Sequence, residues 1–226
     1  MNNAPYPINT QDGAAVYSDR VLKIYDRWVL GFSNNHAWQC PTGTVLLPFF
    51  RQHLGRDHLD VGVGSGFYLA NSPEAAGQRI TLVDLNDNSL RAAAARIANR
   101  QPTLVREDVL KPSGALGERK FDAISLFYLL HCLPGDMAQK GPAVFGLLRR
   151  HLSPEGVLYG ATILGDEAKH NWIGRRLMKL YNRKGIFGNR TDTLASLREA
   201  LAGQFGEVEV RQVGKVALFS ARKPLP

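Results

Sequence analysis

The chain has 226 residues, of which 44% are hydrophobic and 21% charged, and its formal net charge is +8. This composition is typical of a globular protein and excludes an intrinsically disordered chain, and the length suffices for a core without a disulfide or metal staple. The two cysteines, Cys40 and Cys132, form no Cys-x-x-Cys pair, which excludes a zinc ribbon or disulfide framework and indicates a reducing, cytoplasmic setting. The apolar stretches are too short to span a bilayer and the N-terminus lacks the pattern of a secretory signal, so we expect no membrane association.

The positive charge leaves two interpretations open. A basic chain can bind an acidic partner, such as nucleic acid, a phosphorylated or carboxylated small molecule, or a membrane surface. The excess can also be an ordinary solvated surface, because the sequence has no block of five or more like charges.

The first 56 residues are expected to form an N-terminal helical cap. Residues 1–16 are rich in Pro, Asn and Gly and predict an extended lead-in. Ser18 is expected to cap a first helix that Gly31 ends. A second apolar helix is expected over residues 45–54.

The pattern then changes to short strands that alternate with helices, which predicts a parallel sheet with right-handed crossovers. Strands are expected over 58–61, 79–84, 103–106, 121–126 and 156–164, and helices over 67–70, 89–98, 138–152, 169–183 and 193–202. Two final strands, 205–210 and 215–221, are joined tightly and predict an antiparallel hairpin. Residues 57–226 are therefore expected to form a doubly wound, Rossmann-like α/β domain with a seven-stranded sheet.

The most informative segment is the loop after the first strand, Leu59-Asp-Val-Gly-Val-Gly-Ser-Gly66. Glycines at alternate positions allow a tight turn and let a ligand approach the main chain, and the following helix presents N–H groups to a negative group. The second strand ends in Asp84, eighteen residues after Gly66, where a carboxylate can accept the hydroxyls of a ribose.

Two alternatives compete for this loop. A dinucleotide-binding loop, as in a nicotinamide oxidoreductase, would place its third glycine at position 67, which is Phe67 here. The other alternative is a strand–turn–helix corner with no ligand. Neither explains the acid Asp60 ahead of the first glycine.

The pattern Asp-x-Gly-x-Gly-x-Gly resembles the first motif of the class I S-adenosylmethionine-dependent methyltransferases, and the resemblance extends from about residue 57 to 221. It implies S-adenosylmethionine as methyl donor, S-adenosylhomocysteine as product, Asp84 on the ribose, Asp108 and Val109 on the adenine, and Phe127 beside the donor. The donor contacts implied or suspected are Asp60, Gly62, Gly64, Gly66, Asp84, Leu85, Asp108, Val109, Phe127 and Trp38.

Two residues are candidates for catalysis. His131 follows the fourth strand, where the resemblance implies a loop beside the transferred methyl, and it could act as a general base or as a structural hydrogen-bonding group. Tyr25 could line the acceptor site or belong to an apolar helix face. Trp38, in a loop of the cap, could equally contact the ligand or pack in the core, and we hypothesise that the cap closes over the donor.

Several acceptor classes lack their expected residues. After the fourth strand there is no Asp/Asn-Pro-Pro motif of exocyclic-amine enzymes, no Pro-Cys nucleophile and no metal-binding acidic pair. No cluster elsewhere has metal-ligand spacing, so no metal is expected. A small-molecule acceptor is therefore favoured, with its acceptor atom open among O, N, C and S. The alternatives are an RNA or protein methyltransferase, or a donor-binding scaffold without turnover.

Residues 165–204 are the expected acceptor-recognition segment by the same resemblance, and they carry several basic and aromatic side chains. They could bind an acidic acceptor, a carrier-bound intermediate or RNA. At helical spacing, however, the basic positions 176, 179 and 183 lie on one side of the helix, and the apolar positions 173, 177 and 180 lie on another. We therefore expect the basic side chains to face solvent. We expect no binding of nucleic acid. A homodimer is left open.

Overall fold

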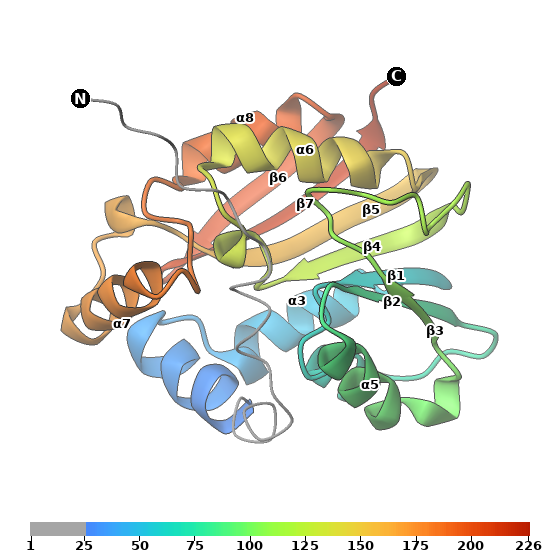
Figure 1. The fold of residues 1–226 in the computed structure, drawn as a ribbon, viewed down its shortest axis with the longest axis horizontal. Helices are drawn as coiled ribbons and strands as arrows, with labels where there is room; N and C mark the ends of the chain where they lie inside the picture. Colours follow the sequence, from blue (N-terminus) through green and yellow to red (C-terminus); the bar gives the residue numbers. More distant parts are fainter. Residues whose placement is uncertain (1–25) are drawn as a thin grey trace.

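The structure is a computed structural model that describes residues 26–226. Figure 1 shows one seven-stranded sheet through the middle of the molecule, in the order β3-β2-β1-β4-β5-β7-β6. The strands are β1 Asp57–Val61, β2 Arg79–Asp84, β3 Thr103–Arg106, β4 Phe121–Phe127, β5 Leu152–Ile163, β6 Phe205–Val213 and β7 Val216–Pro224.

Strands β1 to β5 pair with one another in parallel, and β7 runs antiparallel to both β5 and β6. The predicted doubly wound sheet with a terminal antiparallel hairpin is thus confirmed. The strand order reverses between β1 and β4, and in an open α/β sheet this switch point is where ligands bind, beyond the carboxyl ends of the strands.

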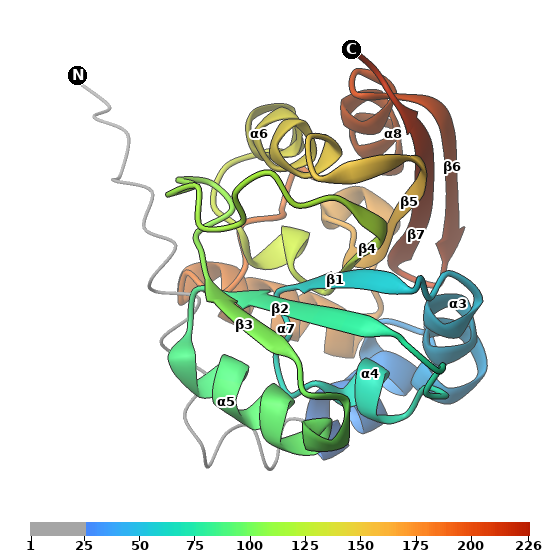
Figure 2. The ribbon, with the colours of Figure 1, turned by 90° about the vertical axis from the view of Figure 1, so that its right-hand side faces the viewer.

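Helices cover both faces of the sheet (Figure 2). They are η1 Asp26–Ala37, η2 Thr42–Leu46, α3 Leu47–Gln52, α4 Phe67–Ala70, α5 Asp87–Arg96, η3 Ala98–Arg100, η4 Leu130–Cys132, α6 Met137–Arg149, η5 Asp166–Ala168, α7 Trp172–Arg183 and α8 Leu194–Ala202. α6 and α8 lie on one face, and α4, α5 and α7 on the other.

Alternation along each strand divides the core into two layers. Leu59 on β1 and Phe145 on α6 belong to one layer, and Leu82 on β2 and Phe50 on α3 belong to the other. Because Phe50 is fully buried in that second layer, the N-terminal helices share a core with the sheet. The proposed domain boundary after residue 56 stays a prediction.

The first described helix departs from the expected pattern, because Gly31 does not end it. The π-helical segment η1 continues to Ala37. Two side-chain hydrogen bonds add to its backbone bonds: Asn35 donates to Gly31 O at 2.8 Å, and Thr42 Oγ1 donates to Leu30 O at 2.5 Å. The lead-in 1–16, the Ser18 cap and Tyr25 lie outside the described residues.

The basic helix α7 is oriented as its periodicity predicts. Arg176, Lys179 and Arg183 are exposed, whereas Ile173 and Leu177 pack against the core. The positive side of this helix therefore faces solvent. Among residues 26–226, every helix is too short or too polar to cross a bilayer.

Candidate functional site

A cavity opens at the switch point of the sheet, beyond the carboxyl ends of β1, β2 and β4. Its space, including the part open to solvent, is about 1020 Å³. Eight of the ten expected donor contacts line it: Asp60, Gly62, Gly64, Asp84, Leu85, Asp108, Val109 and Phe127. The structure brings these residues together because the carboxyl ends of four neighbouring parallel strands, β3, β2, β1 and β4, meet at one edge of the sheet.

The glycine loop forms the floor of this cavity, and its glycines are needed for different reasons. Gly64 has φ +53°, and a Cβ built there would meet no atom within 4 Å, so the main chain is open to a ligand. Gly66 has φ +71°, and its Cβ would lie 2.7 Å from Ala93 Cα on α5. Gly66 therefore allows helix packing and does not line the cavity, whereas Gly64 leaves room beside the main chain.

Asp84 stands at the tip of β2. Its Oδ1 accepts the backbone N–H of Asn86 at 2.9 Å. Burial raises the pKa of Asp84 to about 6, although backbone N–H groups of Asn86 and Gly64 work against this rise. The carboxyl group is thus mainly ionised at pH 7 and can accept hydrogen bonds from two neighbouring hydroxyl groups.

The acids after β3 have different tasks. Burial would raise the pKa of Glu107, but N–H groups of Ser113 and Ala115 and the Ser113 hydroxyl hold it below its usual range. Glu107 therefore fixes the loop. Asp108 Oδ1 accepts the N–H of Leu110 at 2.9 Å, and this residue lines the cavity beside Val109.

Asp60 lies deeper, at the end of β1, and is 6% exposed. Ser125 on β4 donates to Asp60 Oδ1, with 2.5 Å between the oxygens. Burial raises the pKa of Asp60 to about 7; the Ser125 hydrogen bond counteracts this, and the charge of Asp84 adds to it. A buried carboxyl group with such a pKa is suited to meet a cation from a ligand.

The rest of the described lining is largely apolar or aromatic. Apart from the glycine loop and the acids it includes Leu30, Phe67, Tyr68, Phe127, Tyr128, Leu129, Cys132 and Leu133. The Tyr68 and Phe127 ring centroids are 4.7 Å apart, so helix α4 and the end of β4 form one wall.

The sequence did not predict that Tyr68, Tyr128 and Cys132 line the cavity. Tyr68 could have been found from its place directly after the glycine loop. Tyr128 could not, because its φ of +62° turns the chain sharply after β4, which no residue type at that position signals.

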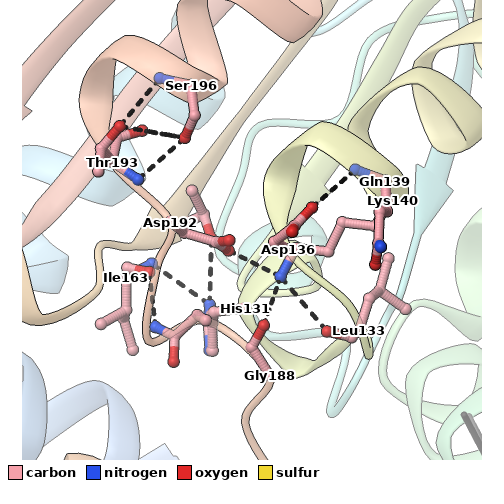
Figure 3. A network of polar contacts seen from close by, with 12 residues as sticks. His131, Leu133, Asp136, Gln139, Lys140, Ile163, Gly188, Asp192, Thr193 and Ser196 are labelled. Carbon is pink, nitrogen blue, oxygen red and sulfur yellow. Dashed lines mark hydrogen bonds and ion pairs between the residues drawn. The ribbon is translucent and has the colours of Figure 1, made fainter. Parts of the chain in front are cut away.

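His131 does not line the cavity, contrary to the expectation of a general base. Figure 3 shows it beside Ile163, whose N–H donates to His131 Nδ1 at 3.3 Å. The ring is 3% exposed and contacts Phe187 at a centroid distance of 4.6 Å. Burial, with the nearby charge of Lys140, lowers the pKa of His131 to about 3, so this neutral side chain serves structure.

Trp38 is also placed away from the cavity. Its side chain is 1% exposed and packs edge-on against His170, with 5.6 Å between ring centroids. Its carbonyl oxygen accepts the N–H of Lys215 at 2.7 Å, which ties the cap to the terminal hairpin. Trp38 is thus a core residue that does not line this cavity, and its expected contact with the donor stays a prediction.

A buried lysine holds the backbone of Leu133, one of the residues that line the cavity (Figure 3). Lys140 on α6 pairs with Asp192 at 2.7 Å and donates to Gly188 O at 2.8 Å and Leu133 O at 3.3 Å. It joins the loop after β4 to the segment before α8. No group of three or more potential metal ligands occurs within residues 26–226.

Known proteins are similar to this chain in sequence. Residues 59–158 match the protein family described as "Methyltransferase domain". The chain is 43% identical over 215 residues to the Physcion biosynthesis cluster O-methyltransferase of Aspergillus chevalieri, covering 95% of this chain and 96% of that protein. It is 39% identical to the O-methyltransferase NEC2 of Pyricularia oryzae (strain 70-15), covering 92% and 91%. The chain belongs to the class I S-adenosylmethionine-dependent methyltransferases.

Solved structures agree with the fold of this methyltransferase. DhpI in complex with S-adenosylhomocysteine (SAH) has a TM-score of 0.65 and 15% identity, covering 96% of this chain and 98% of that one. Human N-acetylserotonin methyltransferase in complex with SAM has a TM-score of 0.63 and 18% identity, covering 94% and 59%. The comparisons do not favour an RNA or protein methyltransferase or a scaffold without turnover.

The donor of the methyltransferase is S-adenosylmethionine, and the cavity fits it. The acid at the tip of β2 matches a ribose, the open main chain at Gly64 matches a close ligand, and the buried Asp60 matches a cationic group. The assignment of each residue to a part of the donor belongs to the proposal below.

Proposed function

We propose that this methyltransferase transfers the methyl group of S-adenosylmethionine to a hydroxyl oxygen of a small, neutral, aromatic acceptor. The observation that carries the proposal is the lining of the cavity, which combines acidic side chains with apolar and aromatic ones and includes no basic side chain among the described residues. The oxygen atom is supported by the named activity of relatives that are 39% and 43% identical along almost the whole chain.

The acidic side chains and the glycine loop would hold the donor. Asp84 would accept the two ribose hydroxyls, and Asp108 with the Val109 main chain would meet the adenine. Gly64 would let the donor lie against the loop, and Asp60 would face the ammonium group. This division follows from the chemistry of each part, because carboxylates accept hydroxyl and ammonium hydrogens while an open main chain allows close contact.

The apolar and aromatic side chains of the lining would hold the acceptor. Among the described lining residues there is no lysine, arginine or histidine that could pair with an acidic group. The basic side chains of α7, such as Arg176 and Lys179, are exposed on the outer side of that helix. A neutral ring packed against the wall of Tyr68 and Phe127 is therefore favoured over the acidic acceptor that the net charge had suggested.

The bound donor supplies a methyl group already activated by its positive sulfur, which becomes neutral on transfer. What the chain must do is align the acceptor oxygen with the methyl group at about 3 Å and keep water out. The apolar wall of Phe127, Leu129 and Leu133 suits that task. A phenolic hydroxyl, with a pKa of about 10, fits a site whose described lining has no histidine, because it gives up its proton more readily than an aliphatic alcohol.

The experiment is methyl transfer from isotope-labelled donor to a matched series: 1-naphthol, 1-naphthylamine and 1-naphthoic acid, followed by wider phenols of one to three rings. We expect label in phenols and none in the amine or acid. Preferred labelling of 1-naphthylamine or 1-naphthoic acid, or of transfer RNA in place of every phenol, would contradict the proposal.

We also propose a cytoplasmic location, which is supported by the absence of a disulfide framework from the sequence. A homodimer stays an open expectation. Fractionation of cells that produce the tagged protein, and light scattering of the pure protein, test the two statements.

A further inference from the structure

Four buried polar side chains form a row beneath the cavity, on the face of the sheet that α3 covers. Asp60 on β1 lies opposite Ser125 on β4, and Ser125 lies opposite Tyr159 on β5. His58 precedes Asp60 by two residues, so it points to the same face. His58, Ser125 and Tyr159 have no exposed surface.

The direction of the hydrogen bonds in this row can be deduced from the chemistry of its members. Ser125 Oγ lies 2.5 Å from Asp60 Oδ1, and because an ionised carboxylate can only accept, the hydroxyl donates to it. His58 Nε2 lies 3.0 Å from the same Ser125 Oγ. Since the hydroxyl hydrogen is already used, His58 Nε2 must carry a hydrogen and donate to the serine.

The histidine has a directing effect on the serine. Ser125 Oγ is also 3.5 Å from Leu59 O, so its hydrogen has two acceptors to choose from. A hydrogen donated by His58 occupies a lone pair of the serine and leaves the hydroxyl directed to Asp60. Burial, with the charge of Arg100, lowers the pKa of His58 to about 3, so the ring stays neutral and adds no charge to the row.

Asp60 has one side in this row and the other in the cavity. Within residues 26–226 its carboxylate forms no ion pair with a basic side chain. The titratable groups whose charges are coupled to it are Asp84 from β2 and Tyr159 from β5, and His58 from its own strand reaches it through Ser125; none of these three is a cation. Phe50 of α3 closes the row from above and is apolar.

We propose that Ser125 and His58 are positioning residues that hold Asp60 as an ionised carboxylate directed into the cavity, ready for the ammonium group of the donor. Ser125 stabilises the charged form by its hydrogen bond, and His58 directs that bond. The inference rests on the proposed binding of the donor ammonium at Asp60, and it adds two residues that do not themselves touch the donor.

The test is isothermal titration calorimetry with S-adenosylhomocysteine between pH 5.5 and 8.5. This ligand keeps the ammonium group and lacks the charged sulfur, so the pH dependence reports on the ammonium contact. For the wild-type protein we expect the affinity to fall as the pH drops through about 7, where Asp60 takes up a proton.

In Ser125→Ala the loss of the hydrogen bond should move this fall to higher pH by about one unit, which lowers the affinity at pH 6.5 by up to about tenfold. At pH 8.5 the affinities should converge. His58→Phe should give a smaller shift in the same direction, and Ser125→Cys, which keeps a weak donor, an intermediate one.

The matched control is Ser89→Ala, which removes another buried hydroxyl, on α5, that makes no contact with Asp60. Its pH profile should match the wild type. An unshifted profile in folded Ser125→Ala and Ser125→Cys, judged by their near-UV circular dichroism, overturns the inference. Absence of binding at every pH in the wild type would instead refute the proposed function.

Discussion

Lys140 and Asp192 form an ion pair of 2.7 Å in which the side chains are 1% and 0% exposed. They come from α6 and from the segment before α8, and the lysine also holds Leu133 O beneath the cavity wall. Removing one charge leaves the other buried without its partner, which typically costs about 3–5 kcal/mol, whereas apolar replacement of both is often neutral.

We therefore expect Lys140→Met to lower the free energy of unfolding by about 3–5 kcal/mol and the double variant Lys140→Met/Asp192→Leu to recover most of this loss. Chemical denaturation measures both values. The control is Asp166→Ala, which breaks an exposed pair with Arg190 and should cost less than about 1 kcal/mol. Equal losses in the buried and exposed variants would show that Lys140 does not hold the wall.

A pair of glycine variants separates binding from folding. Gly64→Ala places a methyl group in open space on the cavity side, so it should weaken binding of S-adenosylhomocysteine while costing about 1–2 kcal/mol through its positive φ. Gly66→Ala adds a clash with Ala93 and should cost clearly more stability. Thermal unfolding and calorimetry on both variants check this. Unchanged ligand affinity in Gly64→Ala would remove the loop from the donor site.

His131 gives a prediction about pH. Its pKa of about 3 lies below that of an unfolded histidine, so between about pH 6.5 and 3 the unfolded chain binds the extra proton. Its contribution to stability is therefore lost as the pH falls through this window. In His131→Phe the fall in stability on acidification should be shallower, by up to about 1.4 kcal/mol per pH unit.

At neutral pH the free energy of unfolding of the same variant should be lower by about 1–3 kcal/mol, because the Ile163 N–H is left without its acceptor. Its methyl transfer should keep the shape of the wild-type pH profile between pH 6 and 9. Disappearance of an ionisation near pH 6.5 from that profile would restore His131 as a general base.

The sequence predicted best those site residues that lie directly at the end of a predicted strand. The glycine loop and Asp84 each end a buried strand, and the alternation of strands and helices placed both at one edge of the sheet. The contact between Asp60 and Ser125 was not predicted, because Ser125 sits inside an apolar strand and its partner depends on the register between β1 and β4.

Residues in irregular segments were predicted least well. The loop after β4 turns at Tyr128 with a positive φ. Because neither helical nor strand periodicity applies to such a loop, the sequence could not predict where the side chains of His131 and Cys132 point. Trp38 follows a π-helical segment that was expected to end at Gly31. The packing of the Trp38 ring against His170, which the sequence does not reveal, shows that Trp38 belongs to the core.

The most direct test of the account is calorimetric titration of S-adenosylhomocysteine at pH 8 into the wild type, Asp84→Ala and the control Asp87→Ala, whose side chain is exposed. We predict one site in the wild type and the control, and affinity lower by at least about tenfold in Asp84→Ala, since ribose hydroxyls lose a charged acceptor worth about 1.5–3 kcal/mol. Equal affinity in all three proteins, or no heat in the wild type, would contradict the assignment of this cavity to the methyl donor.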